Sequence, residues 1–237
     1  MRRVLRILSV ALITAGFVVA GDIAATLLWK EPVSTVYGAI RQGEAADSLE
    51  QLEKAFPSPA DLRVADRVGD DRKRVEVLAD RFAERVDTGE GIGRIKIERI
   101  DLDDVFVEGT DTASLRKGPG HYSNVGDPEQ EGRDDGSAFP GQGRSVGMAG
   151  HRTTYLAPFR EIDKIEDGDE IVLEMPYGEF TYRVQKHEIV DPSEVEIVRD
   201  VGHERLVLTA CHPLYSTAQR WAVFARLEDV GAVEPRA

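Results

Sequence analysis

The stretch RLVLTACHPLYSTAQRWAVFARL, residues 205–227, contains two predicted β-strands and the loop that joins them. Apolar residues fill 206–208, and apolar and polar residues alternate again from Arg220 onward, which is typical of strands. Pro213 helps to end the first strand, and HPLYSTAQ returns the chain. Positions 211 and 220 can then face each other across a hairpin-like return. They are occupied by Cys211, the only cysteine of the chain, and by Arg220.

The same texture extends over residues 91–228. Further strand candidates alternate in the same way and are separated by Gly, Asp and Pro: 92–100, 103–109, 145–150, 169–175 and 179–190. One short piece, 153–163, has helical character. Seven or eight short strands over roughly 140 residues predict an all-β domain, either a closed barrel or a sandwich.

Residues 31–90 precede this domain and are polar and charged. Apolar residues recur at helical spacing within 46–56 and 72–86, and 57–71 between them resembles a linker. The segment is therefore predicted to be a helical stalk or loose linker. It either acts as a plain spacer, which the composition favours, or folds back. Residues 229–237 are expected to form a short C-terminal tail.

Residues 1–30, MRRVLRILSVALITAGFVVAGDIAATLLWK, predict a transmembrane anchor. The 23 residues from Ile7 to Trp29 carry one charge, Asp22. At 1.5 Å per residue they reach about 34 Å, enough to cross a bilayer core of about 30 Å. Arginines at the start predict a cytoplasmic N-terminus, a single pass through the cell membrane and an extracellular catalytic domain. A signal peptide cleaved before Asp22 is the alternative, but apolar residues resume at Ile23.

Composition excludes several functions. The net charge of −13 and the pI near 4.9 argue against binding nucleic acid. A single cysteine excludes an intramolecular disulfide framework and a cysteine-rich metal cluster. The five histidines offer no zinc ligand pattern. The acidic loop 123–143 could bind calcium, but its spacing does not match an EF-hand and a solvated loop is favoured.

Cys211 can be a small buried hydrophobe or a nucleophile. A nucleophile needs a cation or an imidazole close to the thiol. His151, in MAGHRTTY, follows an apolar strand and can lie at a rim where side chains converge. His212 is next to Cys211 but points to the opposite face of an extended strand. Arg220 can donate to an oxyanion. Structural roles for these side chains remain the alternative at this point.

Three motifs together resemble the sortases, specifically class E. They are GIGRIKIERIDLDDVFVEGTD with LRKGPGHY, then AGHRTTYLAPF, and then LTACHPLYSTAQR. The resemblance covers residues 91–228 and extends to the N-terminal anchor. It implies an eight-stranded β-barrel with short helices. It also implies a catalytic site made of Cys211, His151 and Arg220.

The resemblance further implies a membrane-anchored cysteine transpeptidase of a Gram-positive cell. Such an enzyme cleaves a C-terminal sorting signal (LAxTG or LPxTG) of a surface protein between Thr and Gly through a thioester. It then transfers the protein to a cell-wall amine of lipid II or peptidoglycan. Alternatives are a pilus-polymerising sortase that uses a lysine amine, a general cysteine protease, and an inactive barrel that acts as a binding scaffold. No cofactor is expected apart from the calcium considered above.

Three further residues are candidates for contact with substrate. Tyr155 lines the substrate groove or is a packing aromatic. Thr209 is assigned to substrate binding, and His121, in GPGHY, to substrate binding or to a structural role. The chain also departs from the family pattern, because Ala210 stands where relatives often have threonine. Leu156 stands where class E relatives often have glycine.

Overall fold

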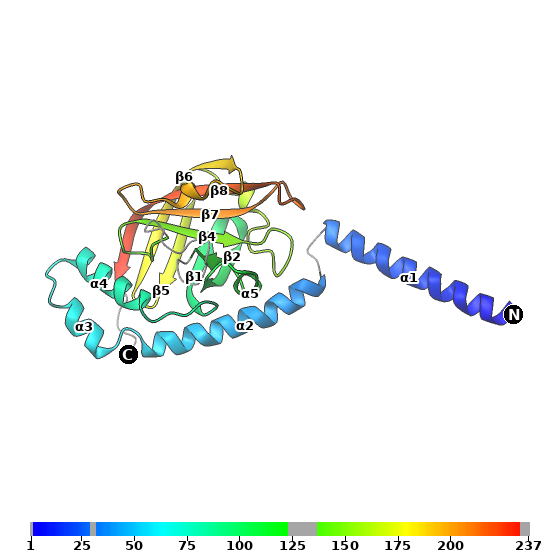
Figure 1. The fold of residues 1–237 in the computed structure, drawn as a ribbon, viewed down its shortest axis with the longest axis horizontal. Helices are drawn as coiled ribbons and strands as arrows, with labels where there is room; N and C mark the ends of the chain where they lie inside the picture. The colour runs from blue at the N-terminus through cyan, green and yellow to red at the C-terminus, as the bar shows by residue number, and fades with distance from the viewer. Residues whose placement is uncertain (1, 29–31, 123–136, 233–237) are drawn as a thin grey trace.

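The computed structural model describes residues 2–28, 32–122 and 137–232. Eight strands form a closed barrel in the order β1-β2-β3-β4-β7-β8-β6-β5 (Figure 1). This confirms the predicted eight-stranded barrel and excludes the sandwich. The strands are β1 (Gly91–Ile97), β2 (Leu102–Glu108), β3 (Gly120–His121), β4 (Ser145–Gly150), β5 (Glu170–Met175), β6 (Gly178–Val190), β7 (Arg205–His212) and β8 (Gln219–Ala232). The two-residue β3 has no strand pattern in the sequence.

The barrel is filled from the inward faces of its strands. Large apolar side chains meet there, among them Ile95, Phe106, Met148 and Phe180, and all four are fully buried. Alternate residues of β7 point inward because side chains of a strand alternate between faces. Leu206, Leu208 and Ala210 accordingly belong to this core.

The helices before the barrel pack against it, so they are not a plain spacer. They are α2 (Pro32–Ala55), α3 (Pro59–Ala65) and α4 (Asp71–Ala83). Figure 1 shows α2 running along one side of the barrel, and it contacts β1 and β2. Phe56, just after α2, and Phe82 of α4 lie in the barrel's main core cluster with their rings 5.3 Å apart. Burying such large apolar side chains stabilises the barrel with its helices as one unit.

The composition of 57–71 predicts a linker, and this is wrong for its centre, which forms α3. Ser58 and Asp61 form a capping box that starts α3, and Pro59 occupies the first turn, where its missing N–H costs nothing. The Asp61 side chain is fully buried and accepts two hydrogen bonds from Arg85, at 2.7 and 2.8 Å. The spacing Ser-Pro-x-Asp was the signal for this helix.

The prediction of a short helix over 153–163 is also wrong. Tyr155, Leu156 and Ala157 have positive φ angles of 49°, 65° and 48°, in the left-handed region that does not continue a helix. Pro158 follows and cannot donate a backbone hydrogen bond. Only a single 3₁₀ turn, η2 (Ile162–Lys164), forms at the end of the segment. Other short turns are α5 (Thr112–Leu115), η1 (Glu98–Ile100) and η3 (Val195–Val198).

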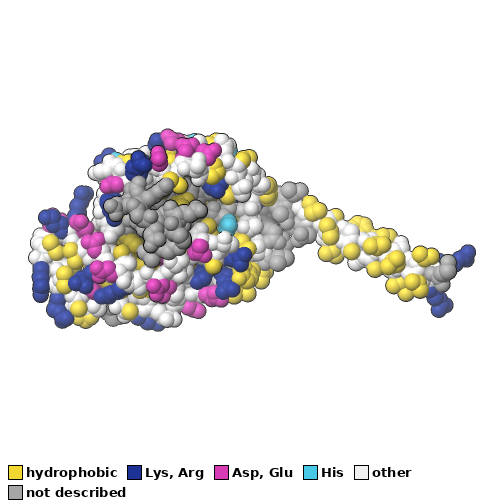
Figure 2. Space-filling model, viewed as in Figure 1, with side chains coloured by type: hydrophobic (Ala, Val, Ile, Leu, Met, Phe, Trp, Pro, Cys, Tyr) yellow, Lys and Arg dark blue, Asp and Glu magenta, His cyan; other side chains and the backbone are white. Residues whose placement is uncertain are grey.

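The N-terminal helix α1 (Arg2–Leu28) extends away from the barrel (Figure 1). Apolar side chains cover its length in Figure 2, and residues Arg2–Gly21 are long and apolar enough to cross a membrane. Exposed apolar surface of this extent is unfavourable in water, so α1 is a candidate membrane span. The acidic residues proposed for calcium lie within 123–136, outside the described residues.

Candidate active site

Strand register brings Cys211, His151 and Arg220 to one end of the sheet. β4 pairs with β7 in parallel, and the last pair of that ladder is Gly150 with Ala210. The next residues along these two strands are His151 and Cys211. On the other side of β7, the antiparallel ladder pairs Cys211 directly with Arg220. The cysteine therefore lies between the histidine and the arginine, as the hairpin-like spacing of 211 and 220 predicts.

All three residues belong to the outer face of the barrel. Ala210 lies in the core, so Cys211 points outward. Arg220 is its cross-strand partner and shares that face. Met148 of β4 points into the core. By the same alternation His151, three residues later, points outward, and it is half-buried. The sequence prediction that His212 points to the other face is consistent with this alternation.

The floor of this face is held by two hydroxyls. Tyr122 donates its O–H to Thr209 Oγ1 at 2.7 Å, and Thr209 donates to the Met148 carbonyl at 3.2 Å. Burial raises the pKa of Tyr122. The hydrogen bond to Thr209 and the charge of Arg220 lower that pKa but do not cancel the effect of burial. Tyr122 is therefore a protonated donor next to the cysteine and arginine. Thr209 is 2% exposed, which favours support over contact with substrate. Tyr122 is a functional candidate that no sequence pattern singles out, although it follows His121 in LRKGPGHY.

His151 lies in a pocket of aromatic and cationic neighbours. Its ring centroid is 5.3 Å from that of Tyr155. Its Nε2 is buried, and no described residue hydrogen-bonds to it. Burial lowers the pKa of His151, and the nearby Arg116 guanidinium lowers it further. The imidazole is thus neutral near pH 7 and free at Nε2 to exchange a proton.

Tyr155 connects His151 to the helices before the barrel. Its ring lies 6.0 Å from Tyr37 of α2, edge to face, and its backbone N–H donates to Ser34 Oγ at 3.2 Å. Gly38 of α2 is buried against the Tyr155–Leu156 backbone, where an added Cβ would lie 2.9 Å from the Tyr155 carbonyl carbon. The histidine loop is therefore braced by a helix more than a hundred residues earlier. These contacts place Tyr155 as a packing aromatic, whether or not it also lines a groove.

Arg220 and Arg152 hold the two loops beside the cysteine. Arg220 donates from Nη1 to the carbonyls of Thr217 and Gln219, each at 3.0 Å. Arg152 is 4% exposed, pairs with Asp163 at 2.8 Å and donates to the Cys211 carbonyl at 3.3 Å. Arg152 therefore connects the end of β7 to the loop that follows His151. No local sequence pattern predicts this role.

His212 faces away from this group. Its ring packs against Trp221, with centroids 5.4 Å apart. Its Nδ1 lies 3.5 Å from Arg152 Nη1. These partners leave it poorly placed as a base for Cys211, in keeping with the sequence prediction.

His121 lies in the interior. Its side chain is 1% exposed, and Nδ1 is 2.8 Å from the Glu108 carboxylate. Nε2 is 3.0 Å from the Ala138 carbonyl, which can only accept, so Nε2 carries a proton. Burial would lower the pKa of His121, but the charge and hydrogen bond of Glu108 outweigh it, and the pKa is raised. This depth favours the structural role over contact with substrate.

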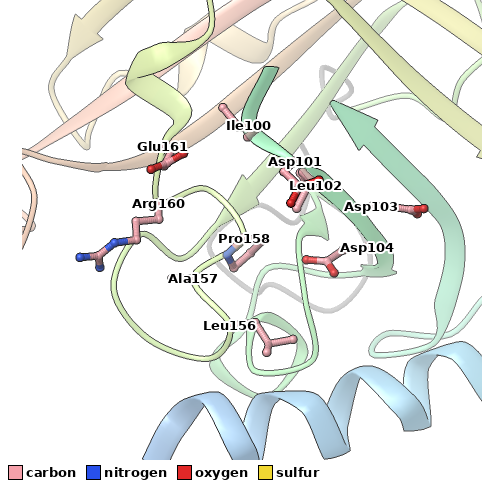
Figure 3. Close-up of a pocket in the computed structure, with 10 residues that line it drawn as sticks. All are labelled: Ile100, Asp101, Leu102, Asp103, Asp104, Leu156, Ala157, Pro158, Arg160 and Glu161. Carbon is pink, nitrogen blue, oxygen red and sulfur yellow. The ribbon is translucent and has the colours of Figure 1, made fainter. Parts of the chain in front are cut away.

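The described residues contain no cluster of three or more His, Cys, Asp or Glu that could hold a metal ion. A cavity of about 530 Å³ lies between the β1–β2 turn and the loop that follows His151. Figure 3 shows its lining, which includes Asp101, Asp104, Leu156 and Pro158. None of the three candidate catalytic residues lines it, so the cavity neighbours the site without forming it.

Comparison with known proteins identifies the family. The sequence profile of the sortase domain matches residues 95–228, more than half of the chain. Sortase D of Bacillus subtilis is 36% identical over 129 residues, which cover 54% of this chain and 57% of that protein. Sortase SrtE2 of Streptomyces coelicolor is 30% identical over 190 residues, covering 69% and 70%. The chain thus spans little more than half the length of the Bacillus relative.

Solved structures agree with this assignment. The sortase E structure from Streptomyces avermitilis is 30% identical, with a TM-score of 0.53 and coverage of 64% of this chain and 96% of that one. A Streptomyces coelicolor sortase E1 structure with a tripeptide in its active site is 26% identical, with a TM-score of 0.54 and coverage of 61% and 91%. The sequence match and the closed eight-stranded barrel lead to one conclusion: the chain belongs to the sortase family.

Proposed function

We propose that this protein is a cysteine transpeptidase in which Cys211 is the nucleophile, His151 the acid–base and Arg220 the oxyanion donor. The observation that carries the proposal is the strand register. It sets Cys211 between the position after Gly150 and the cross-strand partner Arg220. A nucleophile flanked by a base and by a fixed cation can carry out acyl transfer.

In the first half of the reaction, the neutral imidazole of His151 takes the thiol proton as the sulfur attacks the scissile carbonyl. The negative charge moves to the carbonyl oxygen, where the Arg220 guanidinium donates hydrogen bonds. His151 then returns the proton to the departing amine, the C–N bond breaks and a thioester remains on Cys211. The lowered pKa of His151 suits this order, because the ring begins as a base.

In the second half, an amine attacks the thioester carbonyl. His151 takes the amine proton, a new amide bond forms and the C–S bond breaks. The cysteine leaves as a thiolate and is reprotonated by the same imidazole. Incoming and departing amines therefore use the same position beside His151.

The substrate is a surface protein with a C-terminal sorting signal, cut between Thr and Gly, and the acceptor is an amine of lipid II or peptidoglycan. Relatives named both sortase D and sortase E match the chain, and class E, with preference for LAxTG, is our assignment. The apolar helix α1 supports a single-pass anchor in the membrane, with the barrel outside the cell. Such an anchor would hold the enzyme where secreted proteins and lipid-linked amines meet.

A ligation assay tests this function. The full chain, purified in detergent, is incubated with LAxTG and LPxTG peptides and triglycine, and products are followed by mass spectrometry. We expect a ligated product that depends on triglycine, with LAxTG preferred. The full chain is needed because Phe56 and Phe82 belong to the core, so a barrel cut free at residue 85 would lose core side chains. Hydrolysis without ligation would indicate a protease, and no cleavage by the folded protein would indicate a scaffold.

A further inference from the structure

Arg116 is a second cation near His151, and the mechanism above does not use it. It ends the short turn α5, whose Asp111 caps the first N–H groups. Gln42 of α2 donates to the neighbouring Lys117 carbonyl at 2.6 Å, which fixes the backbone here. The Arg116 Nε is buried, and within the described part of the chain it has no hydrogen-bond partner. No carboxylate of a described residue forms an ion pair with its guanidinium.

The Arg116 side chain lies over Tyr155, the ring that also contacts His151. Its guanidinium carbon lies 5.6 Å from the centroid of the Tyr155 ring, and the same ring lies 5.3 Å from the His151 ring. Arg116 and His151 therefore rest on one aromatic side chain. The two side chains are also close enough for the charge of Arg116 to lower the pKa of His151.

A buried N–H without an acceptor, such as the Arg116 Nε, is costly unless a ligand accepts its hydrogen bond. The planar fork of a guanidinium matches a carboxylate, which it binds through two parallel hydrogen bonds. The group that approaches His151 during the second half-reaction is an amine. A carboxylate on the carbon next to that nitrogen would come near Arg116, because Arg116 and His151 share the Tyr155 ring.

We propose that Arg116 is a specificity-determining residue that binds a carboxylate carried on the carbon next to the acceptor amine. The acceptor class is then an amine of amino-acid type with its carboxylate free. The inference rests on the proposed function, since it concerns the second half-reaction. The carboxylate is unchanged in that step, while the nitrogen forms the amide bond and Cys211 leaves.

The test compares two small acceptors, glycine and glycinamide, which differ in that carboxylate. The full chain in detergent is given a sorting peptide and each acceptor, and kcat/KM for each ligated product is measured by mass spectrometry. The ratio of glycine to glycinamide use is then compared between wild type and Arg116→Gln. The difference in basicity between the two amines is the same for wild type and variant, so it cancels between their ratios. A change in the pKa of His151 acts on both acceptors in the variant, so it cancels within the variant's ratio.

We expect the ratio to fall by about tenfold to a hundredfold in Arg116→Gln, as befits loss of a charge-assisted pair. Arg226→Gln, on the exposed face of β8, is the matched control and should keep the wild-type ratio. Arg116→Lys keeps the charge without the fork and should give an intermediate ratio, which serves if the Gln variant does not fold.

An unchanged ratio in folded Arg116→Gln that still ligates both amines would overturn the inference and leave the proposed function standing. Ligation of triglycine but of neither small amine would overturn the inference alone, and failure of the wild type to ligate any of the three amines would overturn the proposed function and the inference with it.

Discussion

The two sides of the candidate active site are held by different kinds of structure. Cys211 and Arg220 lie opposite each other on paired strands, so backbone hydrogen bonds of the barrel set their separation. His151 lies on a loop with left-handed residues at 155–157, and α2 braces that loop through Ser34 and Gly38. The strand side is fixed by local pairing, and the loop side by packing between distant segments. Substitutions should therefore act differently on the two sides.

The largest difference in kcat/KM is expected between substitutions of the two histidines near Cys211, His151 and His212. His151→Ala should lower kcat/KM by about 10²- to 10⁴-fold, because general acid–base catalysis contributes about that much. His212→Ala is the matched control, since its ring packs on Trp221, and it should cost less than tenfold. Peptide ligation by the two folded variants measures this. A larger loss in His212→Ala would reverse our assignment of the base.

Arg220 tests the strand side. Arg220→Ala should lower kcat by about 10²- to 10³-fold, the usual cost of removing one oxyanion donor. Arg226→Ala, on the same strand but away from the cysteine, is expected to match wild type. Steady-state kinetics with both variants checks this. If Arg220→Ala raised KM alone, the guanidinium would be binding the ground state and not the oxyanion.

Glu108 of β2 and His121 of β3 form a buried charge pair, and β3 in turn pairs with β4. Glu108→Ala should lower the free energy of unfolding by about 3 kcal/mol, because it leaves a buried partner unpaired. Glu174→Ala removes the half-exposed pair with Lys96 and should cost less than about 1 kcal/mol. Denaturant unfolding compares the two. Equal losses would mean that the buried pair adds no special stability.

The same pair predicts a pH dependence. Since the pKa of His121 is raised in the folded chain, its contribution is fully present below the imidazole's ordinary pKa of about 6.5. It is lost as the pH rises through the raised value. The stability difference between wild type and Glu108→Ala should therefore shrink from pH 5 to high pH. A difference that grew with pH would show that the histidine is neutral in the folded chain.

The smallest effect tests the brace on the loop side. Gly38→Ala places a Cβ against the Tyr155–Leu156 backbone and should lower kcat/KM by about tenfold, less than the roughly 10²-fold cost of a 1 Å displacement. Gly43→Ala lies on the same helix with nothing within 4 Å, so it should keep activity and gain about 1 kcal/mol of stability. Equal activity in both variants would show that α2 does not position the loop that carries His151.

The contrast between the two sides also explains what the sequence could predict. Strand alternation and the spacing of Cys211 and Arg220 are local, and both predictions were confirmed by the register. The packing of α2 was only the less favoured alternative in the sequence, because Gly38 and Ser34 reveal their role only when the fold brings them to Tyr155. The helix predicted over 153–163 failed because apolar residues there pack without helical backbone angles. Tyr122, Arg152 and Arg116 act through contacts that no short motif encodes.

Leu156 departs from the family pattern, and the structure shows what surrounds it. It stands where class E relatives often have glycine, and its φ of 65° is in the region that glycine adopts most easily. Its side chain is packed close to Gly38, 3.1 Å from where a Cβ would be. The sequence alone marked the position as unusual, and the fold connects it to the α2 brace.

The most direct test of the central claim is to trap the thioester. The full chain in detergent would be mixed with an LAxTG peptide without any amine, quenched in acid and measured by intact mass. Our account predicts a mass increase equal to the peptide up to its threonine, mapped to Cys211 and absent from Cys211→Ala. An adduct on another residue, or ligation that persists in Cys211→Ala, would contradict it.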